Sequence, residues 1–256
     1  MDLGRGCPPG RGRAARPPRP ARASRGVRAR DGAGPGPGSV SSPAVSGRDL
    51  VQRFGARVAL GPLQLVVRQR ERVAVLGGNG AGKTTLLRIL ATAARPAGGS
   101  LELLGLDAVG QRDRLRGRIG YLGHQPGLHP VLTARETLEF FATLHGVEKG
   151  RVPERLAQVG LEQMARERVE QLSRGQQQRL ALARAVLHDP ELLILDEPDA
   201  SLDAPGRCLL GQLAEGRTLV MATHDRELAR QICGRALLLH AGLDRGDPWG
   251  LRVMEA

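Results

Sequence analysis

The residues between Gly77 and Thr85 have the types and spacing that a phosphate-binding loop requires. They fit the pattern G-x-x-x-x-G-K-[ST], which ends at Thr84. Glycines let the backbone curl so that several N–H groups point inward at an anion, and Lys83 adds a charge that can reach the outer phosphates. The Thr84 hydroxyl can ligate Mg²⁺. The residues assigned to phosphate binding are Gly77, Gly78, Asn79, Gly80, Ala81, Gly82, Lys83, Thr84 and Thr85.

The segments on either side of this loop are those that the chemistry needs. The preceding run 73–76 is apolar and rich in β-branched residues, which predicts a buried parallel strand. After the loop, apolar residues recur at helical spacing until Pro96 ends the pattern. A helix that begins here would turn its unpaired N–H groups and its positive dipole end toward the same phosphates.

Two further apolar runs carry polar side chains at their ends. The run 192–195 is followed by Asp196 and Glu197, and the run 218–223 is followed by His224. In open parallel sheets, ligands bind at the carboxyl ends of the strands. We therefore expect these three side chains to lie at the same edge as the phosphate loop.

The remaining patterns predict an α/β fold with a mostly parallel sheet, an antiparallel β region and an inserted helical subdomain. The stretch 48–65 is typical of a β hairpin, with Gly55 and Gly61-Pro62 as turns. From residue 133 to about 170 the pattern is helical, and Ser173 is a favourable N-cap for the next helix. Further strands are expected at 99–105, 119–123 and 236–239.

Composition divides the chain. Its 256 residues are enough for one α/β core with a small subdomain. Residues 1–47 hold nine Arg and two Asp, so +7 of the net charge of +12 lies there. That segment is rich in Gly, Pro and Ala and poor in large apolar residues, which predicts a disordered tail. No apolar run approaches the roughly 18–20 residues that a membrane-spanning helix needs.

Three interpretations of the tail remain open. Its arginines favour an arm that binds nucleic acid or anionic lipid. An organelle transit peptide is also Arg-rich and acid-poor, but the tail has few Ser and no amphipathic period. The third interpretation is an extension without a function. The tail has no aromatic residues for base stacking, which favours this third interpretation, and we expect no nucleic-acid partner.

Taken together, these motifs resemble the nucleotide-binding subunit of an ATP-binding-cassette transporter. The resemblance covers about residues 48–241, with a helical subdomain at about 126–190 and a short polar segment at 242–256. The matching motifs, in chain order, are the adenine-stacking aromatic Phe54, the phosphate loop, the loop glutamine Gln125, the signature Leu172-Ser173-Arg174-Gly175-Gln176, the pair Asp196-Glu197, Asp203 and the switch histidine His224.

The resemblance implies ATP hydrolysis with Mg²⁺. Glu197 would act as general base, His224 would sense the γ-phosphate, and Lys83 and Gln125 would complete the catalytic set. The implied Mg²⁺ ligands are Thr84, Gln125 and Asp196. Outside the phosphate loop, the implied ATP contacts are Phe54, Ser173, Gly175, Gln176 and Asp203.

The resemblance also implies partners. In this family the signature faces the nucleotide bound by the opposite subunit, and this chain has one phosphate loop and one signature. We therefore expect a head-to-tail dimer, formed with a second copy or with a homologous ATPase subunit. The expected third component is a separate multi-spanning membrane permease, with this chain on the cytoplasmic face of the cell membrane.

A closer resemblance comes from Arg174, in the third position of the signature, and from the sequence Gly-His-Gln-Pro-Gly at 123–127. Both are similar to the ATP-binding subunit of the bacterial haem exporter of cytochrome c maturation. The alternative is the ATPase subunit of a drug or lipid efflux transporter. Two more distant alternatives are an ATPase that acts on ribosomes or DNA and an ATP-dependent regulator that transports nothing. Two other departures from the family pattern are Gly78 and Asp199.

Overall fold

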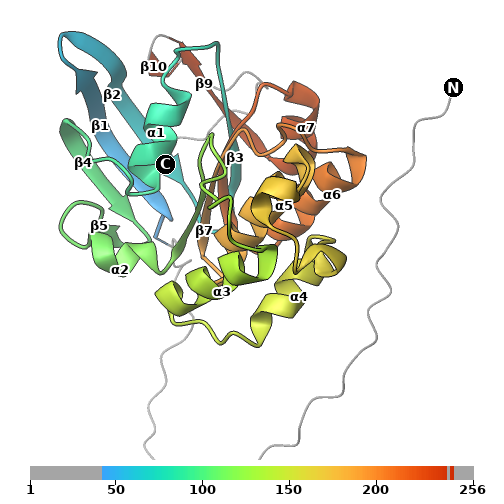
Figure 1. Cartoon of the computed structure of the whole chain (residues 1–256). Coiled ribbons are helices and arrows are strands. Elements are labelled where there is room, and N and C mark those ends of the chain that lie inside the picture. The colour runs from blue at the N-terminus through green and yellow to red at the C-terminus, as the bar shows by residue number, and fades with distance from the viewer. Residues whose placement is uncertain (1–41, 241–242, 245–256) are drawn as a thin grey trace, which may run out of the picture. The chain divides into compact units, whose positions relative to one another are not determined.

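The computed structural model describes residues 42–240 and 243–244. Its centre is a six-stranded sheet in the order β10-β9-β3-β8-β7-β6, in which only the edge strand β10 runs antiparallel to its neighbour (Figure 1). The strands are β3 (Arg72–Leu76), β6 (Ile119–Leu122), β7 (Leu192–Asp196), β8 (Thr218–Ala222), β9 (Arg235–His240) and β10 (Leu243–Asp244).

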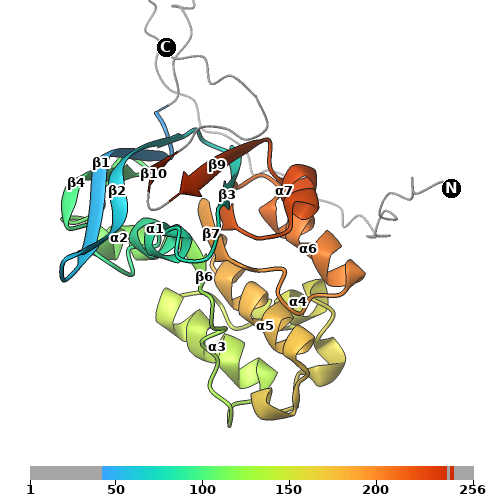
Figure 2. The same cartoon turned by 90° about the horizontal axis from the view of Figure 1, so that it is seen from above.

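The central strands are apolar on both faces because both faces are covered. Leu192 and Ile194 of β7 belong to one hydrophobic cluster, whereas Leu193 and Leu195 belong to another. The first cluster includes α1 (Lys83–Leu90), and the second includes α5 (Arg174–Val186), α6 (Ala204–Ala214) and α7 (Arg226–Ile232). Figure 2 shows the parallel sheet between α1 on one side and these three helices on the other.

A second, antiparallel sheet has the order β2-β1-β4-β5 and covers the outer side of α1 (Figure 2). It is followed by the short helix α2 (Arg112–Arg116), which leads into β6. The strands are β1 (Val45–Phe54), β2 (Arg57–Val67), β4 (Gly98–Leu103) and β5 (Leu106–Asp107).

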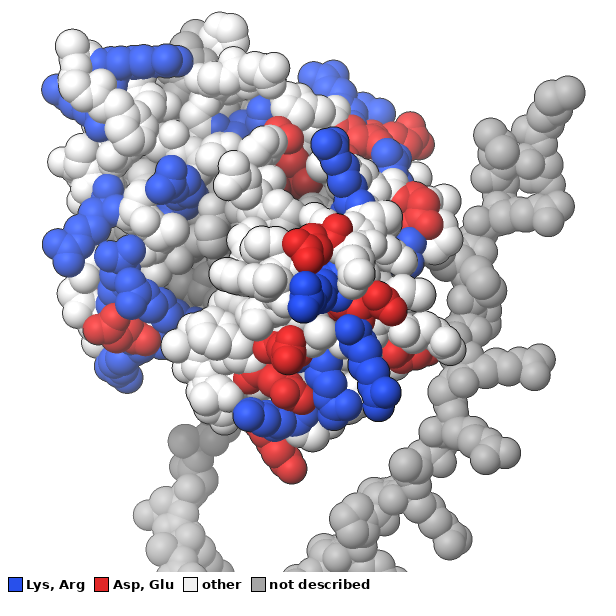
Figure 3. Space-filling model, in the orientation of Figure 1, with Lys and Arg blue, Asp and Glu red and all other residues white. Residues whose placement is uncertain are grey.

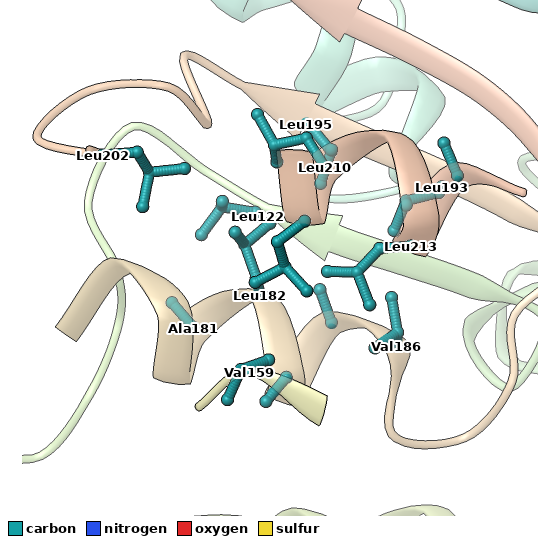
Figure 4. Packing of buried hydrophobic residues seen from close by; sticks show 14 of the residues in the cluster. Leu122, Val159, Ala181, Leu182, Val186, Leu193, Leu195, Leu202, Leu210 and Leu213 are labelled. Atoms are coloured by element: carbon teal, nitrogen blue, oxygen red, sulfur yellow. The ribbon is translucent and has the colours of Figure 1, made fainter. Parts of the chain in front are cut away.

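Between β6 and β7 the chain forms a helical block, defined here as residues 123–191. It contains α3 (Ala134–His145), α4 (Arg151–Gln158), two short 3₁₀ turns (Glu162–Met164 and Val169–Gln171) and α5. Leu182 and Val186 of α5 share a core with Leu193 of β7 and Leu213 of α6 (Figure 4). The block is therefore packed onto the parallel sheet through α5.

The expected fold class is confirmed, and the strands predicted from apolar runs are present. Two boundaries differ. β1 begins at Val45, so residues 45–47 belong to the sheet and not to a tail; Ala44 and Val45 are fully buried. Helix α1 ends at Leu90, well before Pro96, because a turn in which the Ala93 N–H bonds the Arg88 carbonyl closes it. The predicted disorder of residues 1–41 lies outside the described residues, as do residues 241–242 and everything after Asp244.

The expected turn at Gly61-Pro62 is wrong. Both residues lie inside β2, and the hairpin turn is at Gly55 and Ala56. Gly61 has a φ of 98°, and a Cβ there would lie 1.9 Å from the carbonyl oxygen of Leu50 on β1. The register of the β1–β2 ladder shifts beside Leu50, so this glycine marks a bulge where two backbones approach closely. None of the described helices is long and apolar enough to span a membrane.

Candidate active site

A pocket of about 590 Å³ lies at the phosphate loop. Its wall joins three parts of the fold: the loop, the antiparallel sheet and the carboxyl end of the parallel sheet. The lining residues are Phe54, Arg57, Ala59, Asn79, Gly80, Ala81, Gly82, Lys83, Thr84, Thr85, His124 and Glu197. The predicted loop residues 79–85 therefore face a cavity together with Phe54 and Glu197, as a nucleotide site requires, whereas Gly77 and Gly78 do not line it.

Different structural constraints explain the glycines at different positions of the phosphate loop. Gly80 and Gly82 have φ values of 75° and 96°, which side chains rarely adopt. A Cβ on Gly77 would lie 2.4 Å from the Leu239 carbonyl oxygen, so the loop passes tightly over β9. At Gly78 a Cβ would meet nothing within 4 Å, and its backbone is not in the left-handed region. A glycine at this position is therefore a departure from the family pattern without a steric cause.

Lys83 is the first residue of α1 and is only 6 % exposed. Its ammonium donates hydrogen bonds to the carbonyl oxygens of Gly77 (2.9 Å) and Gly78 (3.2 Å), and lies 3.3 Å from Nε2 of His224. The N-terminal turn of α1 faces the same pocket, because Thr84 and Thr85 also line it. Positive charge and unpaired N–H groups thus converge on the place where phosphates would bind.

Asp196 is the last residue of β7 and is 1 % exposed. Among the described residues, neither of its carboxylate oxygens has a hydrogen-bond partner of normal geometry. Burial raises the pKa of Asp196; the Thr84 hydroxyl opposes this shift, and the charge of Glu197 adds to it. A buried carboxylate without a partner is costly, and a divalent cation with oxygen ligands would remove that cost.

Mg²⁺ fits these residues. Mg²⁺ is commonly held by one or two carboxylates, water and substrate phosphates, and not by a cage of protein ligands. The described residues contain no group of three His, Cys, Asp or Glu side chains that could hold a metal alone. Asp196 with the Thr84 hydroxyl offers the partial set that phosphate oxygens would complete.

Glu197 follows directly and has a φ of +53°, an unusual backbone conformation for a residue with a side chain. Its N–H donates to the Ala222 carbonyl on β8 (2.9 Å), which fixes this conformation. One carboxylate oxygen lies 3.1 Å from Nε2 of His224, and the other lies 3.4 Å from Nδ1 of His124. The structure thus brings Glu197 and His224 together with Lys83, as the sequence predicted.

Three residues of the pocket were missed: Arg57, Ala59 and His124. Arg57 lies at the start of β2, and its guanidinium is 3.6 Å from where a Cβ on Gly80 would be. Figure 3 shows that Lys and Arg gather over the antiparallel sheet and α2 on the face it displays. Nothing in the sequence near Arg57 marks it, but His124 had a signal: it comes shortly after an apolar strand, like Glu197 and His224.

The structure does not bring Gln125 to the phosphate loop. Gln125 lines a separate pocket of about 330 Å³ with Pro126, Gly127 and residues of the helical block. It is exposed, and its predicted roles in catalysis and in Mg²⁺ binding stay predictions. Phe54, by contrast, lines the phosphate pocket with a ring that is 59 % exposed and available for stacking.

The signature residues form a second, separate arrangement. Ser173 caps α5 as predicted: its side chain accepts from the Gln176 N–H (3.3 Å), and the Gln176 side chain accepts from the Ser173 N–H (2.8 Å). A Cβ on Gly175 would lie 2.9 Å from the Ser201 carbonyl oxygen, so the loop before α6 passes close to this helix end.

Asp203 belongs to that loop. It caps α6 through the Gly206 N–H and pairs with Arg179 of α5 at 2.6 Å, and these contacts hold the pKa of Asp203 below its usual range. Neither Asp203 nor the three predicted signature contacts, Ser173, Gly175 and Gln176, line the phosphate pocket. Within one chain, the two halves of the predicted ATP site do not meet.

Known proteins with a similar sequence and the same fold show the family of this chain. Residues 60–200 match the family model described as ABC transporter. The chain is 42 % identical over 183 residues to the cytochrome c biogenesis ATP-binding export protein CcmA of Salmonella typhi, covering 70 % of this chain and 88 % of that protein. It is 36 % identical over 232 residues to the Nod factor export ATP-binding protein I of Ralstonia nicotianae, covering 86 % and 72 %.

The structural comparison agrees. A dimeric ATP-binding cassette in a post-hydrolysis state, bound to ADP and phosphate, superposes with a TM-score of 0.73 at 30 % identity, covering 79 % of this chain and 97 % of that one. The phosphate loop, the pair Asp196-Glu197 and the capped signature helix all lie within residues 60–200, which the family model matches. The chain therefore belongs to the ABC transporter family, as one of its ATP-binding, ATP-hydrolysing domains.

Proposed function

We propose that this ATPase works as a head-to-tail dimer and powers a separate membrane subunit that exports haem for cytochrome c maturation. The observation that carries the ATPase chemistry is the position of His224 at the carboxyl end of the parallel sheet. Its Nε2 lies 3.3 Å from the Lys83 ammonium and 3.1 Å from a carboxylate oxygen of Glu197. The haem assignment is supported by the 42 % identity to the export protein CcmA and by the short motifs at Arg174 and 123–127.

Nucleotide binding follows from the pocket. The phosphates of ATP would lie against the loop N–H groups and the first turn of α1, with the Lys83 ammonium on the outer phosphates. The Phe54 ring would stack on the adenine, and Arg57 would add positive charge at the mouth. Thr84 and Asp196 would hold Mg²⁺, which would neutralise charge that develops on the transferred phosphoryl group.

Hydrolysis needs a base and a donor near the γ-phosphate. Glu197 would take the proton of the attacking water, a role worth roughly 10²–10⁴ in rate. His224 contacts the Glu197 carboxylate and lies near the Lys83 ammonium. Its imidazole can therefore turn toward the terminal phosphate. Because positioned donors and cations dominate phosphoryl transfer, the fixed ends of β7 and β8 supply most of the required geometry.

The dimer would complete the site. Ser173 of the partner subunit, with the N-terminus of the partner's α5, would approach the γ-phosphate from the open side of the pocket. Arg174 is exposed in the first turn of α5 in each chain. A cation at that position would add attraction for the bound phosphate across the interface, so this departure from the family signature is compatible with ATP binding.

The membrane subunit would dock on the helical block beside Gln125, from the cytoplasmic face of the membrane. On α3, Phe140 is 58 % exposed and Leu144, one turn later, is 67 % exposed. Phe141 instead packs inward, with the Arg184 guanidinium 5.1 Å from its ring centre. Two large apolar side chains on one turn of an exposed helix face favour a protein contact there.

Export of another cargo is the second candidate, and the 36 % identity to the Nod factor exporter over the longer aligned stretch favours it.

A deletion strain distinguishes haem export from the export of another cargo. If haem export is correct, deletion abolishes holo-cytochrome c, and the wild-type gene or a Glu215→Gln variant, changed at an exposed site, restores it. Normal cytochrome c together with drug or lipid sensitivity would reject the haem assignment and leave the export of other molecules.

A further inference from the structure

Three neighbouring strands of the parallel sheet lead to side chains that meet at one carboxylate, that of Glu197. The middle strand, β7, leads to Glu197. Its neighbours β6 and β8 end at Leu122 and Ala222, and each is followed two residues later by a histidine, His124 or His224. Because these strands are parallel and in register, all three side chains come to the same edge of the sheet.

The two histidines contact different oxygens of Glu197. Nε2 of His224 lies 3.1 Å from one oxygen, and Nδ1 of His124 lies 3.4 Å from the other. The second distance is long for a hydrogen bond, but catalytic contacts are often long before substrate binds. A carboxylate only accepts hydrogen bonds, so this contact needs the proton of His124 on Nδ1.

We propose that His124 is a positioning residue for ATP hydrolysis, which holds the carboxylate of Glu197 in the orientation that the attacking water requires. This inference rests on the proposed role of Glu197 as the base. A glutamate side chain has several rotatable bonds, and a contact on one oxygen leaves the plane of the carboxylate free to turn. A second contact on the other oxygen fixes that plane, and small errors in such placement cost large factors in rate.

The contact also ties the base to the helical block. His124 lies in the segment 121–127, which runs from the end of β6 into the next loop, and both ends of this segment are fastened to α5 by one side chain. Arg184 donates to the carbonyl oxygens of Tyr121 (3.2 Å) and Gly127 (3.0 Å). The position of His124 therefore depends on the position of α5. His124 contacts Glu197 only when α5 packs against the parallel sheet as it does in this structure.

His129 provides a matched comparison. It is exposed and lies in the stretch before α3, like His124, but it does not line the phosphate pocket. The experiment measures steady-state ATP hydrolysis and equilibrium ATP binding by the full chain. We expect His124→Ala to lower kcat about tenfold, with KM and the dissociation constant for ATP changed less than about twofold, and His129→Ala to match the wild type.

Two side-chain replacements test the atom involved. The amide nitrogen of Asn overlaps the position of Nδ1, whereas that of Gln overlaps the position of Nε2. We therefore expect His124→Asn to restore most of kcat and His124→Gln to restore little. If His124→Ala fails to fold, this pair still decides, because both replacements are polar at an exposed site; equal activity of the two would overturn the proposal.

A double variant shows whether His124 acts through Glu197. In single-turnover measurements, adding His124→Ala to Glu197→Gln should cause no further loss, because the group that His124 positions is already gone. Additive losses, a change mainly in ATP affinity, or a wild-type kcat in His124→Ala would each overturn the inference while leaving Glu197 as base. A wild-type rate in Glu197→Gln alone would instead overturn the base assignment itself.

Discussion

The ammonium of Lys83 lies 2.9 Å from the carbonyl oxygen of Gly77, so the lysine of the phosphate loop is held by the loop's own backbone. We expect Lys83→Ala to weaken ATP binding roughly 10- to 100-fold, because a charge-assisted contact worth about 1.5–3 kcal/mol is lost. Calorimetric titration of ATP measures this. Lys149→Ala, which removes an exposed lysine two residues before α4, is the control and should bind like the wild type.

Glu197→Gln separates binding from hydrolysis. Gln keeps the size of the side chain, but it cannot accept the proton of water. We expect hydrolysis to fall by roughly 10²–10⁴ while ATP still binds and the dimer accumulates. Phosphate release and size-exclusion chromatography with ATP measure the two effects, and Glu215→Gln is the control. Undiminished hydrolysis would remove Glu197 from the role of base.

The start of β1 predicts where the chain can be shortened. Val45 is fully buried and pairs with Val67 and with Leu103, so it connects two strands of the antiparallel sheet. A chain that begins at residue 48 should lose about 2–4 kcal/mol of unfolding free energy relative to one that begins at residue 42. Urea unfolding of the two truncated chains tests this, and equal midpoints would contradict it.

Asp189 joins α4 to the core through three arginines. It pairs with Arg155, with Arg151 (2.8 Å) and with Arg217 (3.1 Å), which precedes β8. Asp189→Asn would leave three cations close together, and we expect a loss of about 1–2 kcal/mol in unfolding free energy. Asp113→Asn, which breaks an exposed pair with Arg116, should cost less than about 0.5 kcal/mol. Equal effects would show that the cluster adds nothing.

His188 predicts a pH dependence of stability. Burial, and then the neighbouring His145, lower its pKa from 6.5 to about 4. Between these values the unfolded chain binds a proton that the folded chain does not, so unfolding free energy falls as pH drops through this window. After allowance for partial exposure we expect about 1–2 kcal/mol. His188→Gln should flatten the profile from pH 6.5 to 4, whereas His129→Gln should not.

The sequence predicted best those elements whose pattern is local. Strands buried on both faces read as continuous apolar runs, so β3, β7 and β8 and the polar residues after them were placed correctly. The helix at Ser173 was marked by its cap. These features depend on neighbours along the chain, and the phosphate loop with Glu197 and His224 follows from them.

What the sequence did not predict depends on contacts between distant segments. Gly61 looked like a turn, but the close approach of Leu50 on the neighbouring strand is what requires a glycine there. Arg57 reaches the pocket only because the hairpin folds over α1, and no local pattern marks such an event. Gln125 was expected beside the phosphates, yet it lines a separate pocket with Pro126 and Gly127, in a loop that Arg184 fastens at Gly127.

The left-handed backbone conformation of Glu197 lowers the stability of the fold at a position where the side chain is needed for activity. A non-glycine residue in this region costs of order 1 kcal/mol or more, which glycine would not incur. A chain designed for stability alone would carry glycine there, and it would have no carboxylate for the two histidines to hold. Searches for thermostable variants of this protein will therefore tend to select against catalysis at residue 197 unless activity is screened at the same time.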